Sequence, residues 1–326
     1  MHRPFRFFLY FVVLYHAVAI AMMYILHENG TEIVLQYYQQ NAHLLLYLNG
    51  DIIQTAIIAL VTLTMAFVLE RRAHQFAVIY AFFGSMLFYP TFSMMKTSLP
   101  LLAPYFADPF WAEFDRLLHF GIDPWEIVLV HLPNLGFPSI PARIASHLYL
   151  SIWFFIMLFM PSIVAISDSD VWRKKRFVIM FFVCWLGLGN VLALMGLSVG
   201  PVFYDRVYDS TRFAEFTAVF NASEIGNSQL KIVQGFLWRG FESGSQELGV
   251  GISAFPSVHV GMTTVCVLYF WERFWALGVI MGLFWVFIFI YSIASGYHYA
   301  LDGYASALVV WSVWRFMLRQ ERLSAS

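Results

Sequence analysis

The most informative part of the sequence begins with FPSVHVG at residues 255–261 and ends with GYHYALDG at residues 296–303. Between these two polar clusters the chain is almost entirely apolar. His259 and His298 are 39 positions apart. This is enough for one helix to cross a bilayer and a second to return, at roughly 17–25 residues per span. The spacing therefore predicts two membrane spans that bring both clusters to the same membrane face.

The composition also indicates a membrane protein. Of the 326 residues, 60% are hydrophobic and only 12% are charged, which lies outside the range for soluble domains. The formal net charge of −1 argues against a nucleic-acid surface. Cys184 and Cys266 fall inside apolar runs, so we expect free thiols. Residues 5–26 have the length of a full span and no small-residue cleavage site after them, which favours an uncleaved anchor.

We predict an all-α polytopic protein with about eight transmembrane helices. The expected spans are 5–26, 52–69, 76–95, 143–166, 177–199, 258–272, 275–294 and 299–318. The basic residues that gather on one side of these spans are Arg3, Arg6, Arg71, Arg72, Arg173, Lys174, Lys175, Arg176, Arg273, Arg315, Arg319 and Arg322. Because basic residues favour the cytoplasmic side, both termini are predicted cytoplasmic and both polar clusters face the outside.

The two clusters contain the side chains of a candidate reactive site. His298 and Asp302 are four apart, so on a helix they share one face and the carboxylate can accept a hydrogen bond from the ring. That bond fixes the tautomer and leaves the other ring nitrogen as nucleophile or base. Pro256 suits the first turn of a helix, so we expect unpaired N–H groups near residues 257–260. With the Ser257 hydroxyl these groups form an anion site, at which His259 can donate a proton.

These residues resemble the type 2 phosphatidic acid phosphatase superfamily, and the chain is most similar to its inositol phosphorylceramide synthase-like branch. The Pro-Ser-x-His motif appears at residues 256–259 and the His-x-x-x-Asp motif at residues 298–302. The resemblance implies that His298 is the nucleophile that forms a phosphohistidine and that Asp302 orients it. It also implies that His259 is the general acid and that Ser257 helps to hold the phosphate.

One departure from the superfamily concerns the cation that binds the phosphate. The Lys-x6-Arg-Pro motif of most members is absent, and the residues after the fifth span read GPVFYDR at 200–206. The synthase-like branch also lacks this motif. Since a phosphate dianion in a partly dry site needs a cationic partner, Arg206 is the first candidate, followed by Lys231 and Arg239. An ordinary loop arginine is an equally good interpretation of Arg206.

The expected organisation has three parts. Residues 1–95 hold N-terminal transmembrane helices, and residues 143–326 form a catalytic transmembrane core with an outer cap at 200–257. Residues 96–142 mix prolines with aromatic residues, which is typical of helices lying at the membrane interface.

The function that this sequence predicts is a metal-independent lipid phosphatase or phosphotransferase without a cofactor, most simply in a bacterial cytoplasmic membrane. Its partners are the bilayer, a lipid phosphate and, for transfer, an alcohol acceptor. Two alternatives stay open. The cluster of two histidines and an aspartate could form a proton or ion path in a transporter or channel. It could also ligate a metal such as iron or zinc.

Overall fold

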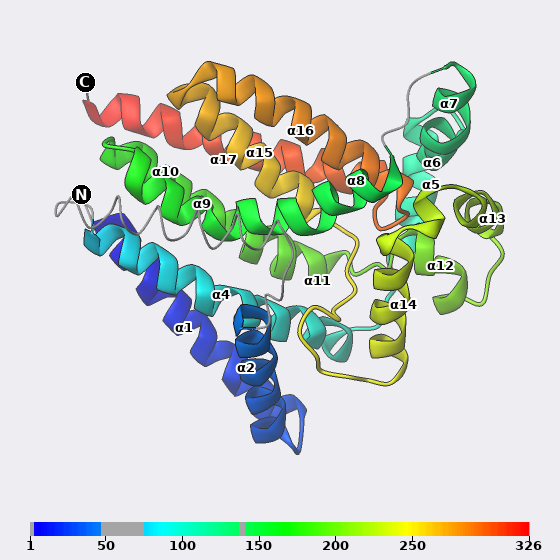
Figure 1. Ribbon diagram of the computed structural model, residues 1–326, viewed down its shortest axis with the longest axis horizontal. Helices are drawn as coiled ribbons and strands as arrows, with labels where there is room; N and C mark the ends of the chain where they lie inside the picture. The colour runs from blue at the N-terminus through cyan, green and yellow to red at the C-terminus, as the bar shows by residue number, and fades with distance from the viewer. Residues whose placement is uncertain (1–2, 47–74, 137–140, 326) are drawn as a thin grey trace. The chain divides into compact units, whose positions relative to one another are not determined.

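A computed structural model describes residues 3–46, 75–136 and 141–325, and the regular structure within them is helical (Figure 1). The chain divides into two compact units. One unit comprises Met1–Ser98, Ile156–Val178 and Gln246–Gly249, and the other comprises Leu99–Phe155, Ile179–Ser245 and Val250–Ser326.

Among the described residues, five helical stretches are long and apolar enough to cross a membrane. They are α1 (Arg3–Leu26); α4 (Gln75–Leu102); Ala142–Ser167, which joins α8 (Ala142–His147), η2 (Leu148–Ile152) and α9 (Trp153–Ser167); Val171–Met195, which joins α10 (Val171–Phe182), η3 (Val183–Leu192) and α11 (Ala193–Met195); and α16 (Trp275–Ala294). These stretches match five of the expected spans and show that the chain has the helices of an integral membrane protein.

The other three expected spans are not among these five. Residues 52–69 lie outside the described residues. Residues 258–272 and 299–318 fall on α15 (Val258–Arg273) and α17 (Ala300–Ala325), which are both helical. However, α15 has only 16 residues, and α17 mixes small and charged residues with its apolar ones. Eight crossings therefore stay a prediction.

In the first unit, α2 (Gly30–Leu46) packs against α1, in a stretch over which the sequence predicts no membrane span. Ala19 and Met23 of α1 contact a face of α2 that includes Ile33 and Tyr37, which are one helical turn apart. The turn between the helices needs Gly30, because a Cβ there would lie 3.0 Å from the Met23 carbonyl oxygen. The short apolar stripe on α2 is the signal that the sequence contained.

Two helices begin or end away from their expected limits. α4 continues past residue 95 to Leu102, and within this extension Thr97 Oγ1 donates to the Ser93 carbonyl and Ser98 Oγ to the Met94 carbonyl. α10 begins at Val171, so the basic cluster at residues 173–176 lies on a helix. Asp170 starts that helix, since its Oδ1 accepts the backbone N–H of Trp172 at 2.8 Å.

In the second unit, α15, α16 and α17 lie side by side (Figure 1). The turn between α15 and α16 consists of Phe274, directly after Arg273, as the sequence predicts. Gly261 of α15 allows η3 to approach closely, because a Cβ at this position would lie 2.7 Å from Leu188 Cδ1. These four elements form the helical body on which the polar clusters are placed.

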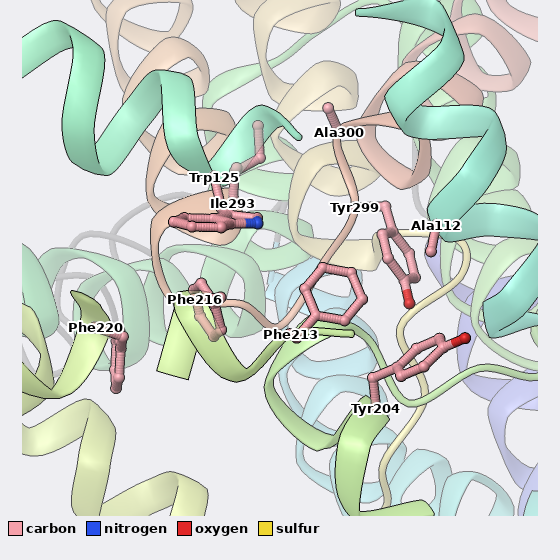
Figure 2. Close-up of a cluster of buried hydrophobic side chains, with 9 residues drawn as sticks. All are labelled: Ala112, Trp125, Tyr204, Phe213, Phe216, Phe220, Ile293, Tyr299 and Ala300. Carbon is pink, nitrogen blue, oxygen red and sulfur yellow. The ribbon is translucent and has the colours of Figure 1, made fainter. Parts of the chain in front are cut away.

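The remaining segments of the second unit form short helices near the start of α17. The residues before α8 form α5 (Asp108–Leu118), α6 (Pro124–Glu126), η1 (Ile127–His131) and α7 (Leu132–Asn134), and the expected cap forms α12 (Pro201–Val207), α13 (Ala214–Ala222), η4 (Ile225–Asn227) and α14 (Gln229–Glu242). Figure 2 shows the apolar cluster in which α5, α6, α12 and α13 meet α16 and the start of α17: Ala112, Trp125, Tyr204, Phe213, Phe216, Phe220, Ile293, Tyr299 and Ala300. Tyr299 and Ala300 directly follow His298, so this cluster supports the second polar motif.

Candidate active site

The first polar cluster forms the start of α15. Ser257 is the N-cap residue, and its Oγ accepts a hydrogen bond from the Val260 N–H at 3.4 Å. Serine is favoured at this position because its oxygen satisfies an N–H group that has no partner within the helix. The prediction that Pro256 lies in the first turn is wrong. Because Ser257 caps the helix, Pro256 lies before it, joined to Phe255 by a cis peptide bond.

The backbone amides of this cluster are also partly used. The Ser257 N–H donates to the Asp302 carbonyl oxygen at 3.2 Å, and the Val260 N–H is taken by the cap. The expectation of unpaired amides is therefore wrong for these two groups. The bond between Ser257 and Asp302 links the start of α15 to the first turn of α17, so the two motifs meet in space.

The second cluster places a histidine beside a buried aspartate. The predicted contact is confirmed, since His298 Nδ1 lies 3.3 Å from Asp302 Oδ2. However, His298 precedes α17 instead of lying on it, and its Nδ1 is closer to the Ala254 carbonyl oxygen, at 2.8 Å. Because a carbonyl can only accept, Nδ1 carries the ring proton and the neutral ring has an unprotonated Nε2. This tautomer is the one that a nucleophilic imidazole needs.

The Asp302 carboxylate is fully buried. Its Oδ2 accepts the Tyr299 N–H at 3.0 Å in addition to the contact with His298. Its Oδ1 has no hydrogen-bond partner among the residues that the structure describes. Burying a carboxylate oxygen without a partner is costly, so its presence here calls for an explanation. A role in orienting the His298 ring, which Oδ2 contacts, would explain why this carboxylate is buried.

His259 extends from the first turn of α15 into an aromatic environment. Its ring centroid lies 3.9 Å from that of Trp153 and 4.7 Å from that of Tyr149, with near-parallel planes in the second pair. The Trp153 indole N–H donates to the His259 carbonyl at 3.2 Å and to Thr263 Oγ1 at 3.0 Å. The centroid of the His298 ring is 6.2 Å away. The aromatic side chains thus fix the orientation of His259 close to His298.

The structure brings together Ser257, His259, His298 and Asp302, whereas the three candidate cations have other contacts. The exposed Arg206 guanidinium lies 5.0 Å from the Trp238 ring centroid. Lys231 Nζ, also exposed, donates to Asn221 Oδ1 at 2.5 Å, and Arg239 lies exposed on α14. No contact described here joins these cations to the two histidines, so their role in binding phosphate stays a prediction.

Sequence reasoning missed two acids on α5 that reach the same region. Asp108 and Asp115 are buried, and they contact the backbone or side chains of residues 299–301. Burial raises the pKa of Asp115 to about 6, although the N–H groups of Leu301 and Ala300 oppose this shift. Burial also raises the pKa of Asp108. The available signal was their spacing of seven residues, which puts both acids on one face of a helix that is otherwise rich in apolar residues.

The described side chains contain no group of three His, Cys, Asp or Glu residues placed to hold a metal ion. Cys184 and Cys266, expected as thiols outside any disulfide, are both buried and form no disulfide bond. The two motifs bring together two imidazoles, one carboxylate and one hydroxyl.

Comparison with known families identifies one match. The model of the PAP2 superfamily matches residues 110–316, which is more than half of the chain and includes both polar clusters. No match was found among curated proteins or among solved structures.

Proposed function

Since the chain belongs to the PAP2 superfamily, whose members are generally phosphatases or phosphotransferases, we propose that it cleaves a phosphate ester of a membrane lipid. The observation that carries this proposal is the convergence of His259 and His298, with ring centroids 6.2 Å apart. This separation is short enough for both rings to contact one phosphoryl group. The tautomer of His298 supports its role as the nucleophile.

The proposed reaction has two steps. His298 Nε2 attacks phosphorus, the P–O bond to the lipid alcohol breaks, and His259 gives its proton to the departing oxygen. The resulting phosphohistidine is then attacked by water or by an acceptor alcohol. In that step His259 takes a proton from the attacking oxygen and the N–P bond breaks. Asp302 orients His298 and stabilises its positive charge through Nδ1.

Ser257 and a cation complete the proposed phosphate site. The Ser257 hydroxyl lies at the N-terminus of α15, where the helix dipole favours an anion. Arg206, Lys231 and Arg239 stay the candidates for the cation. Because His298 and His259 supply both nucleophile and acid, we propose that the reaction needs no metal.

The proposed location is the outer face of a cytoplasmic membrane, with eight spans and helices of residues 96–142 at the interface. On α5, Phe110 and Leu117 are 60% and 69% exposed, while Asp108 and Asp115 are buried. Because α5 exposes apolar side chains and buries its two acids, its exposed face is better suited to contact with lipid than with water. A site at headgroup level would receive a phosphatidic acid-like lipid, a polyprenyl phosphate or a phospholipid donor. The absence of the Lys-x6-Arg-Pro motif resembles the inositol phosphorylceramide synthase-like branch, and both hydrolysis and transfer stay open for the phosphohistidine.

The deciding experiment supplies purified protein with labelled lipid phosphates, with and without alcohol acceptors. Phosphate release would identify hydrolysis, and a new lipid ester would identify transfer. We expect His298→Ala to abolish both while the protein folds normally, because it removes the nucleophile. The control His131→Ala changes an exposed histidine of η1 and should keep full activity.

Two results would contradict this proposal. Turnover by the His298→Ala variant at the rate of the unmodified protein would remove the assigned nucleophile. Loss of activity with chelator and recovery with a divalent ion would favour the metal enzyme instead.

A further inference from the structure

We propose that Asp115 and Asp108 of α5 are positioning residues that hold His298 and Asp302 in their reactive geometry. This inference rests on the proposed function and adds a role for a helix that is distant in sequence from both motifs. The two acids act through the backbone and side chain of residues 299–301, which lie between His298 and Asp302.

Asp115 caps a helix to which it does not belong. Its Oδ2 accepts the Ala300 N–H at 3.0 Å, and its Oδ1 accepts the Leu301 N–H at 2.9 Å. These are the first two residues of α17, whose N–H groups have no partner within that helix. Both carboxylate oxygens of Asp115 therefore accept hydrogen bonds from the turn that connects His298 to Asp302, and they hold it in place.

Asp108 fixes the residue directly after His298 from a second direction. Its Oδ1 accepts the Tyr299 hydroxyl at 2.9 Å and the Gly200 N–H at 2.9 Å. Its Oδ2 accepts the Val199 N–H at 2.8 Å. The Tyr299 ring lies in the apolar cluster of Figure 2, so side-chain packing and this hydrogen bond together hold one position.

Burying the carboxyl groups of Asp108 and Asp115 costs free energy of folding, which suggests that their contacts have a function. Asp108 is 0% and Asp115 is 2% exposed, and burying a carboxylate costs free energy that hydrogen bonds offset. An apolar residue at either position would pack without that cost. Asp115 instead directs both oxygens, and Asp108 directs Oδ1, at residues 299–301, which connect His298 to Asp302. Asp108 also holds the backbone of residues 199 and 200.

The positioning role predicts a specific kinetic defect. In Asp115→Asn one acceptor oxygen becomes an NH2 group that faces a backbone N–H, so the first turn of α17 shifts. A misplacement of about 1 Å at a nucleophile costs on the order of 100-fold in rate. We therefore expect kcat to fall by about that factor while KM changes little, because the proposed phosphate contacts of Ser257 are not touched. Tyr299→Phe, which loses one hydrogen bond of Asp108, should show a smaller fall in kcat.

The matched control is Asp123→Asn. Asp123 is also a buried acid of the same segment, but its carboxylate pairs with Arg212, with both contacts at 2.7 Å. No contact described here joins it to α17, so kcat should match that of the unmodified protein even if the variant is less stable.

A measurement without substrate separates this inference from the proposed function. The ¹⁵N shifts of His298 report which ring nitrogen carries the proton. We expect a single tautomer protonated at Nδ1 in the unmodified protein and in Asp123→Asn, and a mixture in Asp115→Asn. Unchanged ¹⁵N shifts in folded Asp115→Asn would overturn the inference, as would an unchanged kcat. If no lipid phosphate is turned over, the proposed function fails while the ¹⁵N shifts still decide the positioning role.

Discussion

His259 and His298 have the same side chain but different surroundings, and this difference leads to a testable distinction. His298 is held through Nδ1 by the Ala254 carbonyl and Asp302, whereas His259 is packed against Trp153 and Tyr149. The first arrangement suits a nucleophile and the second a proton donor that approaches the leaving oxygen.

We expect His259→Ala to lose the most activity on esters with poor leaving groups. The activity lost by this variant should become smaller as the pKa of the leaving alcohol falls, because a good leaving group departs without a proton. The check is kcat/KM across a series of phosphate esters, compared with His298→Ala, which should be inactive on all of them. Equal losses across the series would contradict the acid role of His259.

Single residues also show how far sequence reasoning reaches. The contact between His298 and Asp302 could be predicted because four positions along one chain segment fix the distance. The meeting of Ser257 with Asp302 followed from two motifs at neighbouring span ends. Asp115 could not be predicted in the same way, because it bonds to the backbone N–H groups of residues 185 and 186 positions away. Every residue except proline can supply a backbone N–H, so such a contact leaves no pattern of side chains.

At the scale of helices, starts and ends depend on a few side chains that compete with the backbone. The apolar runs predicted where α1, α4 and α16 lie, but the start of α10 depended on a carboxylate group. In α10 the basic cluster at residues 173–176 was expected in a connection, because charged residues are typical of loops. Asp170 instead begins a helix there and accepts the N–H groups of Trp172 and Arg173.

The cap of α10 yields a stability prediction. Asp170→Ala removes the oxygen that accepts two N–H groups, which should lower the free energy of unfolding by about 1 kcal/mol. Asp170→Asn is the matched control, because it keeps the acceptor oxygen and loses only the charge opposite Arg173, at 3.8 Å. Equilibrium denaturation in detergent micelles measures both. If Asp170→Asn lost as much stability as Asp170→Ala, the ion pair and not the cap would be responsible.

For the whole molecule, the distribution of charge predicts an orientation in the membrane. Positively charged residues occur at both ends of the chain and in its short connections, and the long connections that form α5 to α7 and α12 to α14 have few. With eight crossings all of the basic segments face the cytoplasm, and α13 lies on the outside. An odd number of crossings would put the two chain ends on opposite faces.

Two cysteine variants test this orientation. Ala218→Cys places a thiol on exposed α13, and Ser324→Cys places one near the exposed end of α17, while the native thiols of Cys184 and Cys266 are buried. In sealed right-side-out vesicles, a membrane-impermeant maleimide should label the variant at position 218 at once. It should label the variant at position 324 only after detergent opens the vesicles. Labelling of both variants before detergent would contradict the predicted path of α17 through the membrane. Labelling of position 324 before detergent and of position 218 only after it would contradict an outward-facing site.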